Sequence, residues 1–258
     1  MRQRSGVHTS IPAERDLAEV ERSAAEARHT VLKPVEVERY LAPPGDTPFP
    51  LEYAHHLLGD VREKFVLDLG CGTGEKLVPI GKLGAQTMGI DISPDLIALA
   101  QTRLENEGLP SHVQVGSAYE TGMESGSVDV IFCMALIHHL EIPRVRDEML
   151  RILAPQGVVI LKEPIRVSST YARLRHMLPE HENVSEYEHP LTEEEFAAMT
   201  EPFQIEGLRY FRLPFVPLVR RIVPSMERLA WKTDYRILQG WPGLNRYATI
   251  VVARLRRK

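Results

Sequence analysis

The chain has 258 residues, of which 43% are hydrophobic and 26% are charged, and its net charge is −4. This length can bury a full core, so we expect one α/β domain with an appendage. The sequence has no run of eighteen apolar residues and no signal-like apolar start, which excludes a membrane span and predicts a cytoplasmic protein. The two cysteines, Cys71 and Cys133, cannot form a disulfide framework, and neither belongs to a C-x-x-C zinc motif.

Charge is distributed unevenly along the chain. Residues 207–258 hold twelve Lys or Arg and two acids, a net charge of +10, so the first 206 residues carry −14. Both tryptophans, Trp231 and Trp241, lie in the basic part. The molecule therefore has an acidic body and a basic, aromatic tail.

Helices are predicted before the first strand, and strands alternate with helices after it. Apolar spacing and breaker residues predict N-terminal helices over 13–31, 35–41 and 51–58. Strands are predicted over 65–69, 86–90, 112–115, 128–134 and 158–162, with a turn at 155–157 before the last. Helices are predicted up to Lys82, from Pro94 behind a Ser93 cap, and over 144–153. This alternation predicts a doubly wound parallel sheet.

The first strand ends in a glycine loop, Asp68-x-Gly70-x-Gly72-x-Gly74. Glycines at alternate positions bring bare backbone close to a ligand, with the amides of a helix N-terminus aimed at it. Asp91 follows at the tip of the second strand, where such folds hold a ribose. The pair predicts a cofactor that contains a nucleoside.

The glycine spacing differs from the dinucleotide fingerprint G-x-G-x-x-G. It resembles the first motif of the class I S-adenosylmethionine-dependent methyltransferases, of the type that acts on small molecules. The resemblance implies S-adenosylmethionine as cofactor, with Asp68 near its ammonium group. The cofactor-binding residues predicted in this way are Asp68, Gly70, Cys71, Gly72, Thr73, Gly74, Asp91, Ile92, Ser117, Ala118, Met134 and Ala135.

Two later segments extend the resemblance. Gly116-Ser117-Ala118 stands where the family usually has Gly-Asp-Ala, whose acid accepts a hydrogen bond from the adenine amine. Ser117 lacks that charge, which weakens the contact by roughly 1 kcal/mol. Residues 129–140 match the family's fourth-strand motif, where backbone near 133–135 takes the amino group of the methionine.

The resemblance also implies an architecture. We expect a Rossmann-like, doubly wound, seven-stranded sheet, mostly parallel, with strands six and seven over 203–213 and 248–255 and the last strand antiparallel. The expected parts are an N-terminal helical lid (1–60), the S-adenosylmethionine-binding core (61–165), an inserted substrate cap (166–200) and C-terminal strands with a basic amphipathic segment (201–258). Tyr40, Phe49 and Tyr53 either close the pocket or are ordinary packing aromatics. The cap is rich in charged and aromatic residues that include Arg173, Arg175, His176, His181, Glu186, Tyr187, Glu188 and His189.

Methyl transfer from a sulfonium is an in-line displacement, so the protein mainly aligns the reactants and excludes water. A base is needed only when the acceptor loses a proton. His138 and Glu163 follow the fourth and fifth strands at the carboxyl edge of the sheet, and either is a candidate catalytic base. In the alternative, His139 packs a helix and Glu163 pairs with Lys162 or Arg166. No ligand spacing supports a metal site, and none is expected.

The predicted activity is methyl transfer to a small-molecule or lipid-like acceptor, at oxygen rather than nitrogen or carbon. One alternative is a nicotinamide-dependent oxidoreductase, opposed by the glycine spacing and by the lack of a Tyr-x-x-x-Lys pair. Another is a non-catalytic nucleoside-binding protein. Nucleic acid is an unlikely substrate because the first 206 residues are acidic and the fourth strand lacks an Asn/Asp-Pro-Pro-aromatic run. A monomer or a homodimer is expected.

The basic tail carries an amphipathic pattern. Apolar residues at helical spacing, interrupted at Pro224, alternate with basic ones; the apolar set is Leu218, Ile222, Met226, Leu229 and Ala230, and the basic set is Arg220, Arg221, Arg228 and Lys232. Such a helix lies on an anionic membrane or clasps a long apolar acceptor. The alternative is a cap or dimer helix that buries its apolar face.

Overall fold

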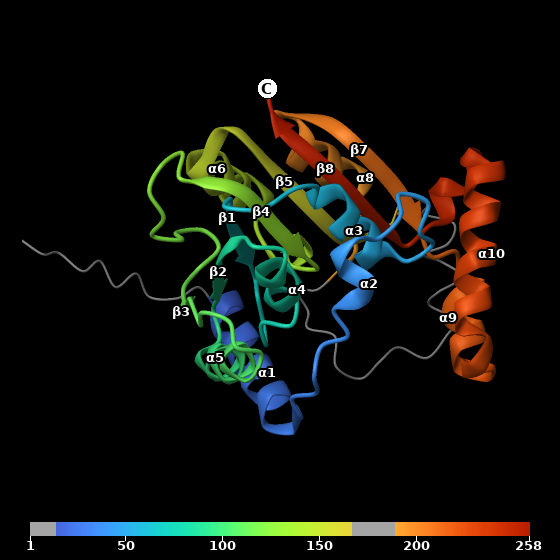
Figure 1. Ribbon diagram of the computed structural model, residues 1–258. Helices are drawn as coiled ribbons and strands as arrows, with labels where there is room; N and C mark the ends of the chain where they lie inside the picture. The colour runs from blue at the N-terminus through green and yellow to red at the C-terminus, as the bar shows by residue number, and fades with distance from the viewer. Residues whose placement is uncertain (1–13, 167–188) are drawn as a thin grey trace, which may run out of the picture.

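The computed structural model describes residues 14–166 and 189–258. Seven strands lie in the order β3-β2-β1-β4-β5-β8-β7, and a short β6 pairs with the end of β5 (Figure 1). The first five strands of this order are mutually parallel, whereas β8 runs antiparallel to both β5 and β7. The predicted fold class is confirmed. The strands are β1 Phe65–Leu69, β2 Gln86–Asp91, β3 Val113–Val115, β4 Val128–Met134, β5 Leu153–Arg166, β6 Leu191–Thr192, β7 Phe203–Phe211 and β8 Ile250–Arg257.

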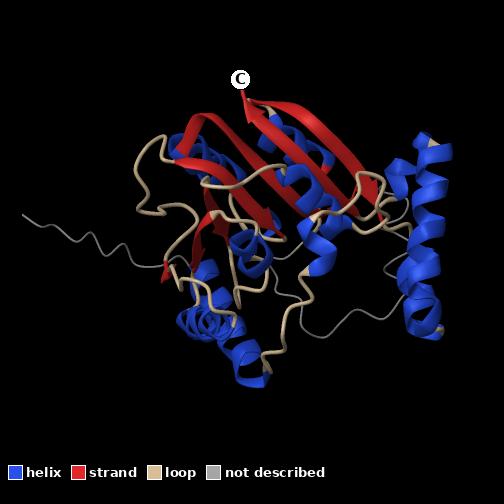
Figure 2. Cartoon of the chain, viewed as in Figure 1, coloured by secondary structure: helices blue, strands red, loops and turns tan. Residues whose placement is uncertain are grey.

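Helices cover both faces of the sheet (Figure 2). The described α-helices are α1 Glu14–His29, α2 Glu38–Leu41, α3 Pro50–Leu58, α4 Leu77–Lys82, α5 Pro94–Asn106, α6 Ile142–Ile152, α8 Glu193–Thr200, α9 Phe215–Ile222 and α10 Glu227–Gly240. Short 3-10 turns are η1 Ile137–His139, η2 Pro224–Met226 and η3 Pro242–Tyr247. None of the described helices combines the length and apolar character needed to cross a membrane.

The central strand β4 shows why the sheet is buried on both sides. Ile131 and Cys133 pack into the core beneath α6, while Val130 and Phe132 pack into the core that contains α3. Because successive side chains of a strand point to opposite faces, a strand covered on both faces must be apolar throughout. Only Asp129 departs from this, and its exposed carboxylate accepts a hydrogen bond from the Phe65 amide at 2.9 Å.

Strand β5 is longer than predicted at both ends, because it begins at Leu153 rather than Val158 and ends at Arg166 rather than Lys162. Leu153 pairs with Val128, and the register then shifts so that Val158 pairs with Val130. The predicted turn at 155–157 is therefore wrong. The chain passes through these residues as an irregularity within one extended strand, as in a β-bulge.

Most other boundaries differ by one or two residues or follow the predicted caps, whereas α2 begins at Glu38, three residues later than predicted. Strand β3 starts at Val113, one residue later than predicted, and α6 starts at Ile142, two residues earlier, with Pro143 in its first turn. Ser93 caps α5 as predicted, since its hydroxyl accepts from the Leu96 amide at 3.3 Å. Most of the predicted cap, from Arg173 to Glu188, lies outside the described residues.

Candidate active site

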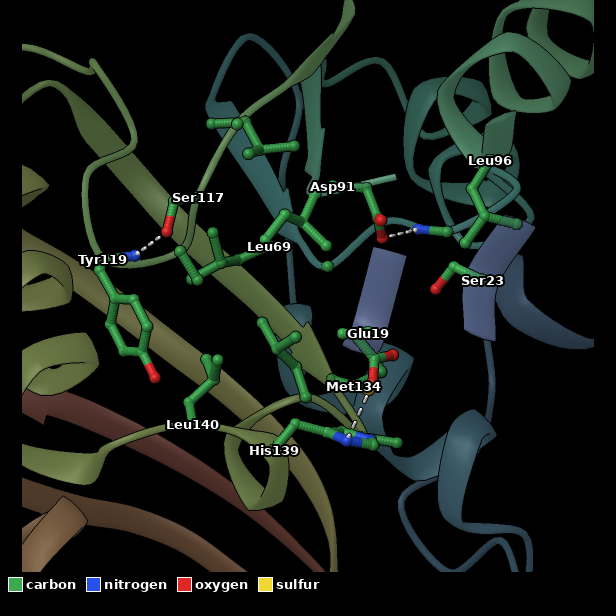
Figure 3. Close-up of a pocket in the computed structure, with 18 of the residues that line it drawn as sticks. Glu19, Ser23, Leu69, Asp91, Leu96, Ser117, Tyr119, Met134, His139 and Leu140 are labelled. Atoms are coloured by element: carbon green, nitrogen blue, oxygen red, sulfur yellow. Dashed lines mark hydrogen bonds and ion pairs between the residues drawn. The ribbon is translucent and has the colours of Figure 1, made fainter. Parts of the chain in front are cut away.

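A cavity of about 220 Å³ opens at the carboxyl ends of β1, β2 and β4 (Figure 3). Ligands of open α/β sheets bind at this edge. Eight of the twelve predicted cofactor residues line it: Gly70, Gly72, Asp91, Ile92, Ser117, Ala118, Met134 and Ala135. The other four, Asp68, Cys71, Thr73 and Gly74, are not among the lining residues.

The three glycines of the loop share a backbone conformation, but Gly72 and Gly74 serve different purposes. All have positive φ angles, between 53° and 74°. A Cβ at Gly72 would meet nothing within 4 Å, whereas one at Gly74 would lie 3.0 Å from the Ala100 side chain on α5. Gly72 thus leaves its face open toward the cavity, and Gly74 permits close packing of loop and helix. Thr73, which lies between these two glycines, is also held in place, because its carbonyl accepts a hydrogen bond from Arg103 Nε at 2.8 Å.

Asp91 joins the end of β2 to the glycine loop. One carboxylate oxygen accepts from the Gly72 amide at 2.8 Å, and the other accepts from the Ser93 amide at 3.0 Å. Burial raises the pKa of Asp91, while these two amides oppose the rise. Since each carboxylate oxygen can accept more than one hydrogen bond, the group keeps capacity for ligand hydroxyls at the cavity wall.

Asp68 is a buried acid without a donor. Its side chain has no exposed surface, and neither oxygen accepts a hydrogen bond from a described residue. Burial raises its pKa to about 7, and the positive charge of Lys76, which lines the cavity, opposes that rise. An unpaired buried carboxyl is costly. This environment suits an acid whose partner is a cation brought in by a ligand.

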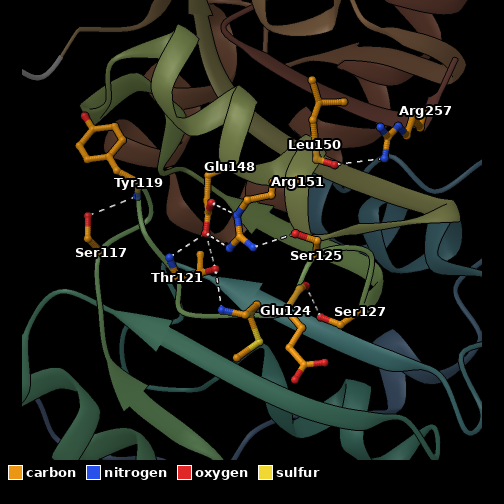
Figure 4. A network of polar contacts seen from close by, with 11 residues as sticks. Ser117, Tyr119, Thr121, Glu124, Ser125, Ser127, Glu148, Leu150, Arg151 and Arg257 are labelled. Carbon is orange, nitrogen blue, oxygen red and sulfur yellow. Dashed lines mark hydrogen bonds and ion pairs between the residues drawn. The ribbon is translucent and has the colours of Figure 1, made fainter. Parts of the chain in front are cut away.

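The loop after β3 forms another side of the cavity and is anchored from below (Figure 4). Ser117 faces the cavity, and its hydroxyl accepts from the Tyr119 amide at 3.2 Å. Farther along, the Thr121 amide donates to Glu148 at 2.8 Å, and Arg151 holds the same carboxylate through its Nε at 2.7 Å. Burial would raise the pKa of Glu148, but the hydrogen bonds from Arg151 and Thr121 lower it. Helix α6 thereby fixes the position of the loop.

The turn after β4 is organised by Glu163. One oxygen of this fully buried carboxylate accepts from the amides of Leu136 at 2.9 Å and Ile137 at 3.0 Å, and the other lies 2.8 Å from His138 Nδ1. Just before these amides, Ala135 adopts a left-handed conformation with φ of 58°. The two predicted catalytic residues therefore contact each other, and neither is among the residues that line the cavity. Glu163 does not take Lys162 or Arg166 as its hydrogen-bond partner.

The histidine among the lining residues is His139, for which the sequence predicts packing against a helix. Its Nδ1 lies 3.7 Å from a carboxylate oxygen of Glu19 on α1. Burial raises the pKa of Glu19, but Arg22 and the two histidines together lower it by more, so the net shift of the pKa is downward. The sequence predicts α1 itself, as a charged helix with a thin apolar seam, but gives no signal for the surface on which it packs.

Helix α1 supplies the N-terminal wall of the cavity, through Glu19, Arg22 and Ser23. The aromatics considered as closing residues lie elsewhere. Tyr53 packs against Phe211 with ring centroids 5.7 Å apart, and Phe49 faces Trp231 at 6.4 Å. Tyr40 packs on His55. The packing interpretation of these three residues is therefore correct for this structure.

The fold and the site define a class of protein. Residues 67–161 match the family model described as "Methyltransferase domain". Together with the strand order and the cavity, this match confirms the resemblance to the class I S-adenosylmethionine-dependent methyltransferases, whose cofactor is S-adenosylmethionine. The open face of Gly72 and the carboxylate of Asp91 fit a cofactor with a sugar that approaches the backbone, and the unpaired Asp68 is a buried acid close to the same loop.

Individual relatives cover part of the chain. The ubiquinone biosynthesis O-methyltransferase of Xanthomonas oryzae pv. oryzae is 31% identical over 131 residues, which are 48% of this chain and 53% of that protein. The chain thus spans about half the length of the curated relatives it matches.

Solved structures share the fold over nearly the whole chain. The geranyl diphosphate C-methyltransferase of Streptomyces coelicolor A3(2), solved with Mg²⁺, geranyl diphosphate and S-adenosyl-L-homocysteine, has a TM-score of 0.61 at 14% identity and covers 96% of this chain and 100% of its own. The [4+2]-cyclase SpnF has a TM-score of 0.55 at 16% identity, covering 94% and 93%. Because one fold hosts both chemistries, activity must be argued from the site.

Proposed function

We propose that this chain transfers the methyl group of S-adenosylmethionine to a hydroxyl oxygen of a small or lipid-like acceptor. The observation that carries the proposal is the pairing of the Gly72 amide with the Asp91 carboxylate at the wall of the cavity, 2.8 Å apart. The choice of oxygen is supported by the relatives named O-methyltransferase. When bound, S-adenosylmethionine supplies an already activated methyl group.

The residues of the cavity divide the work of binding. Asp91 accepts hydrogen bonds from sugar hydroxyls, and the Ser117–Ala118 segment binds the base. Asp68 attracts the ammonium, while Lys76 provides a positive charge for the carboxylate, because it is a cation in the lining. Helix α1 limits access of water to the site. These contacts would hold the methyl donor in one orientation, which is the main requirement of an in-line displacement.

Deprotonation of the acceptor needs a base near the cavity, and we assign it to His139. This residue lines the cavity, and a carboxylate oxygen of Glu19 lies 3.7 Å from its Nδ1, close enough to balance the charge that the ring gains when it takes the proton of the acceptor. His138 and Glu163, the predicted bases, then act on the reaction by positioning: they hold the turn that presents Ala135, Leu136 and His139. A direct catalytic role for them stays a prediction.

The test is labelled methyl transfer from S-adenosylmethionine into fractionated metabolite and lipid extracts, followed by mass spectrometry of the labelled product. A methyl ether is expected, and His139→Gln should lower its rate most between the acidic range, where a protonated imidazole cannot serve as base, and the alkaline range, where a hydroxyl acceptor ionises unaided. Label on nitrogen or carbon contradicts the choice of atom. Cofactor binding without label transfer into any fraction favours a non-catalytic protein.

A further inference from the structure

The helical pair α9–α10 presents an apolar surface that the fold does not use. We name as the tip surface the residues Leu218, Ile222, Val223, Met226 and Leu229, whose exposed fractions lie between 40% and 67%. They gather around η2, where α9 passes into α10. Figure 1 shows this end of the two helices standing at the margin of the molecule, away from the sheet. A contiguous exposed apolar surface of this kind marks a binding site.

The same helices already have a side that packs on the body. Val216, Ala230 and Leu238 are buried. The buried carboxylate of Asp234 accepts from the amides of Arg212 at 2.9 Å and Leu213 at 2.7 Å, which attaches α10 to the end of β7. The tip surface is therefore a second face of these helices and is not the face that holds them in place.

Every exposed charged residue between 215 and 247 is basic. These residues are Arg220, Arg221, Arg228, Lys232, Arg236 and Arg246. Three of them, Arg228, Lys232 and Arg236, recur every fourth residue and so share one face of α10. The two acids of the segment, Glu227 and Asp234, are partly and fully buried.

Basic residues elsewhere in the tail are used by the fold. Arg254 Nε lies 2.8 Å from Glu206, and Arg209 donates to the Gly45 carbonyl at 2.7 Å. In contrast, Arg221, Lys232 and Arg236 make no ion pair with any described residue. The positive charge of the helical pair is thus available to a partner.

We propose that the tip surface and its basic residues bind the surface of an anionic lipid membrane. A lipid interface accepts apolar side chains among its acyl chains while its headgroups attract Lys and Arg. A second copy of the chain would bring two positively charged helices together. A nucleic acid would satisfy the charges but would leave Leu218, Ile222 and Leu229 in water. The membrane is the partner that uses both features.

The experiment is co-sedimentation of the full chain with vesicles of phosphatidylcholine, with and without phosphatidylglycerol, at low and high salt. Binding is expected only with the anionic lipid, and it should weaken as salt screens the charges. Absence of binding to anionic vesicles at low salt overturns the proposal, as does equal binding to both kinds of vesicle.

Variants separate the apolar from the basic contribution. The apolar variant combines Leu218→Ser, Ile222→Ser and Leu229→Ser, and its control is Ile205→Ser, a residue 42% exposed on β7. The basic variant combines Arg221→Gln, Lys232→Gln and Arg236→Gln, and its control is Lys64→Gln, an exposed residue before β1. Far-UV circular dichroism and thermal unfolding check that each variant folds.

We expect the basic variant to lose roughly a hundredfold in vesicle affinity, from about fivefold for each charge removed near the surface. The apolar variant should lose at least tenfold in vesicle affinity, about the effect of removing two or three buried methylene groups. Both controls should bind as the unchanged chain does. Unchanged binding by folded variants contradicts the proposal. A dimer of the unchanged chain in sedimentation velocity without vesicles, together with a monomeric apolar variant, also contradicts it. Tighter binding to a nucleic acid duplex than to vesicles does so as well.

Discussion

The two walls of the cavity are built differently. In the glycine-loop wall, the Gly72 amide donates to the Asp91 carboxylate, and this contact spans 19 residues of sequence. In the strand-tip wall, the turn that carries Leu136 is held by Glu163, a buried carboxylate on the next strand that accepts from the Leu136 and Ile137 amides. The first wall depends on backbone geometry that few residues can adopt. The second depends on one side chain whose role emerges only when strands β4 and β5 are side by side.

This difference explains what could be predicted. Positive φ angles at Gly70, Gly72 and Gly74 leave a spacing that is visible in the sequence, and the continuous apolar run of β4 gives its bounds correctly. The side chain of Glu163 could have faced the cavity or the turn, since both lie at the same edge of the sheet. The structure turns it to the amides.

Contacts between distant segments were the least predictable. Helix α1 brings Glu19 and Arg22 to the cavity, yet nothing in its sequence names the surface it covers. His138 was predicted as the base rather than His139. Both follow the tip of the same strand, so their spacing does not tell which of the two faces the cavity. The extension of β5 was missed because Pro155, Gln156 and Gly157 are typical of turns, while pairing of Leu153 with Val128 keeps the chain extended.

The largest expected effect concerns Asp68, which lies behind the glycine-loop wall. Its pKa is about 7 in the folded chain and 3.8 in a free side chain, so below pH 4 both states are protonated and ionisation carries no penalty. Between pH 4 and 7 only the unfolded state ionises, so the free energy of unfolding falls with rising pH, and above pH 7 the loss is complete at about 4 kcal/mol. Asp68→Asn should therefore be more stable than the unchanged chain at pH 8 and should show a smaller gain at pH 4.

Chemical unfolding without cofactor at these two pH values measures the effect, with the exposed Asp95→Asn as the matched control. The same variant should bind S-adenosylmethionine more weakly, because it lacks the charge proposed to attract the ammonium. The assignment is contradicted if the stability that Asp68→Asn gains over the unchanged chain is smaller at pH 8 than at pH 4.

Glu163 tests the strand-tip wall. Glu163→Ala leaves a part-buried amide, a buried amide and a buried histidine without their acceptor, which should cost about 3 kcal/mol of folding free energy. Glu163→Gln keeps an acceptor for the amides and should cost about half as much. The exposed Glu105→Ala on α5 serves as control.

Cofactor affinity distinguishes a positioning role from a merely stabilising one. If Glu163 positions the turn, Glu163→Gln should weaken S-adenosylmethionine binding in conditions where the variant is fully folded. Equal affinity and turnover in the folded Gln variant would remove Glu163 from both the binding and the catalytic account.

Asp91 tests the glycine-loop wall directly. Asp91→Ala removes a charged acceptor and should weaken S-adenosylmethionine binding by about 2 kcal/mol, or roughly thirtyfold. Asp95→Ala, four residues farther along and exposed, should have no effect. Calorimetric titration measures both. An affinity that does not change in Asp91→Ala refutes the role of this wall.

The smallest expected effect restores a charge. Ser117→Asp places an anionic acceptor where the family usually has one, and it should strengthen cofactor binding by about 1 kcal/mol. Ser127→Asp, exposed and remote from the cavity, is the control, since it adds the same charge elsewhere. Weaker binding in Ser117→Asp with normal binding in Ser127→Asp indicates that Ser117 does not face the base.

The central claim is that the cavity at the ends of β1, β2 and β4 accepts a nucleoside with a methionine attached. Calorimetric titration of the unchanged chain with S-adenosylmethionine and, separately, with NAD tests it most directly. The account predicts saturable binding of S-adenosylmethionine with one site per chain and no heat of binding with NAD. Binding of NAD alone, or of neither compound at millimolar concentration, would contradict it.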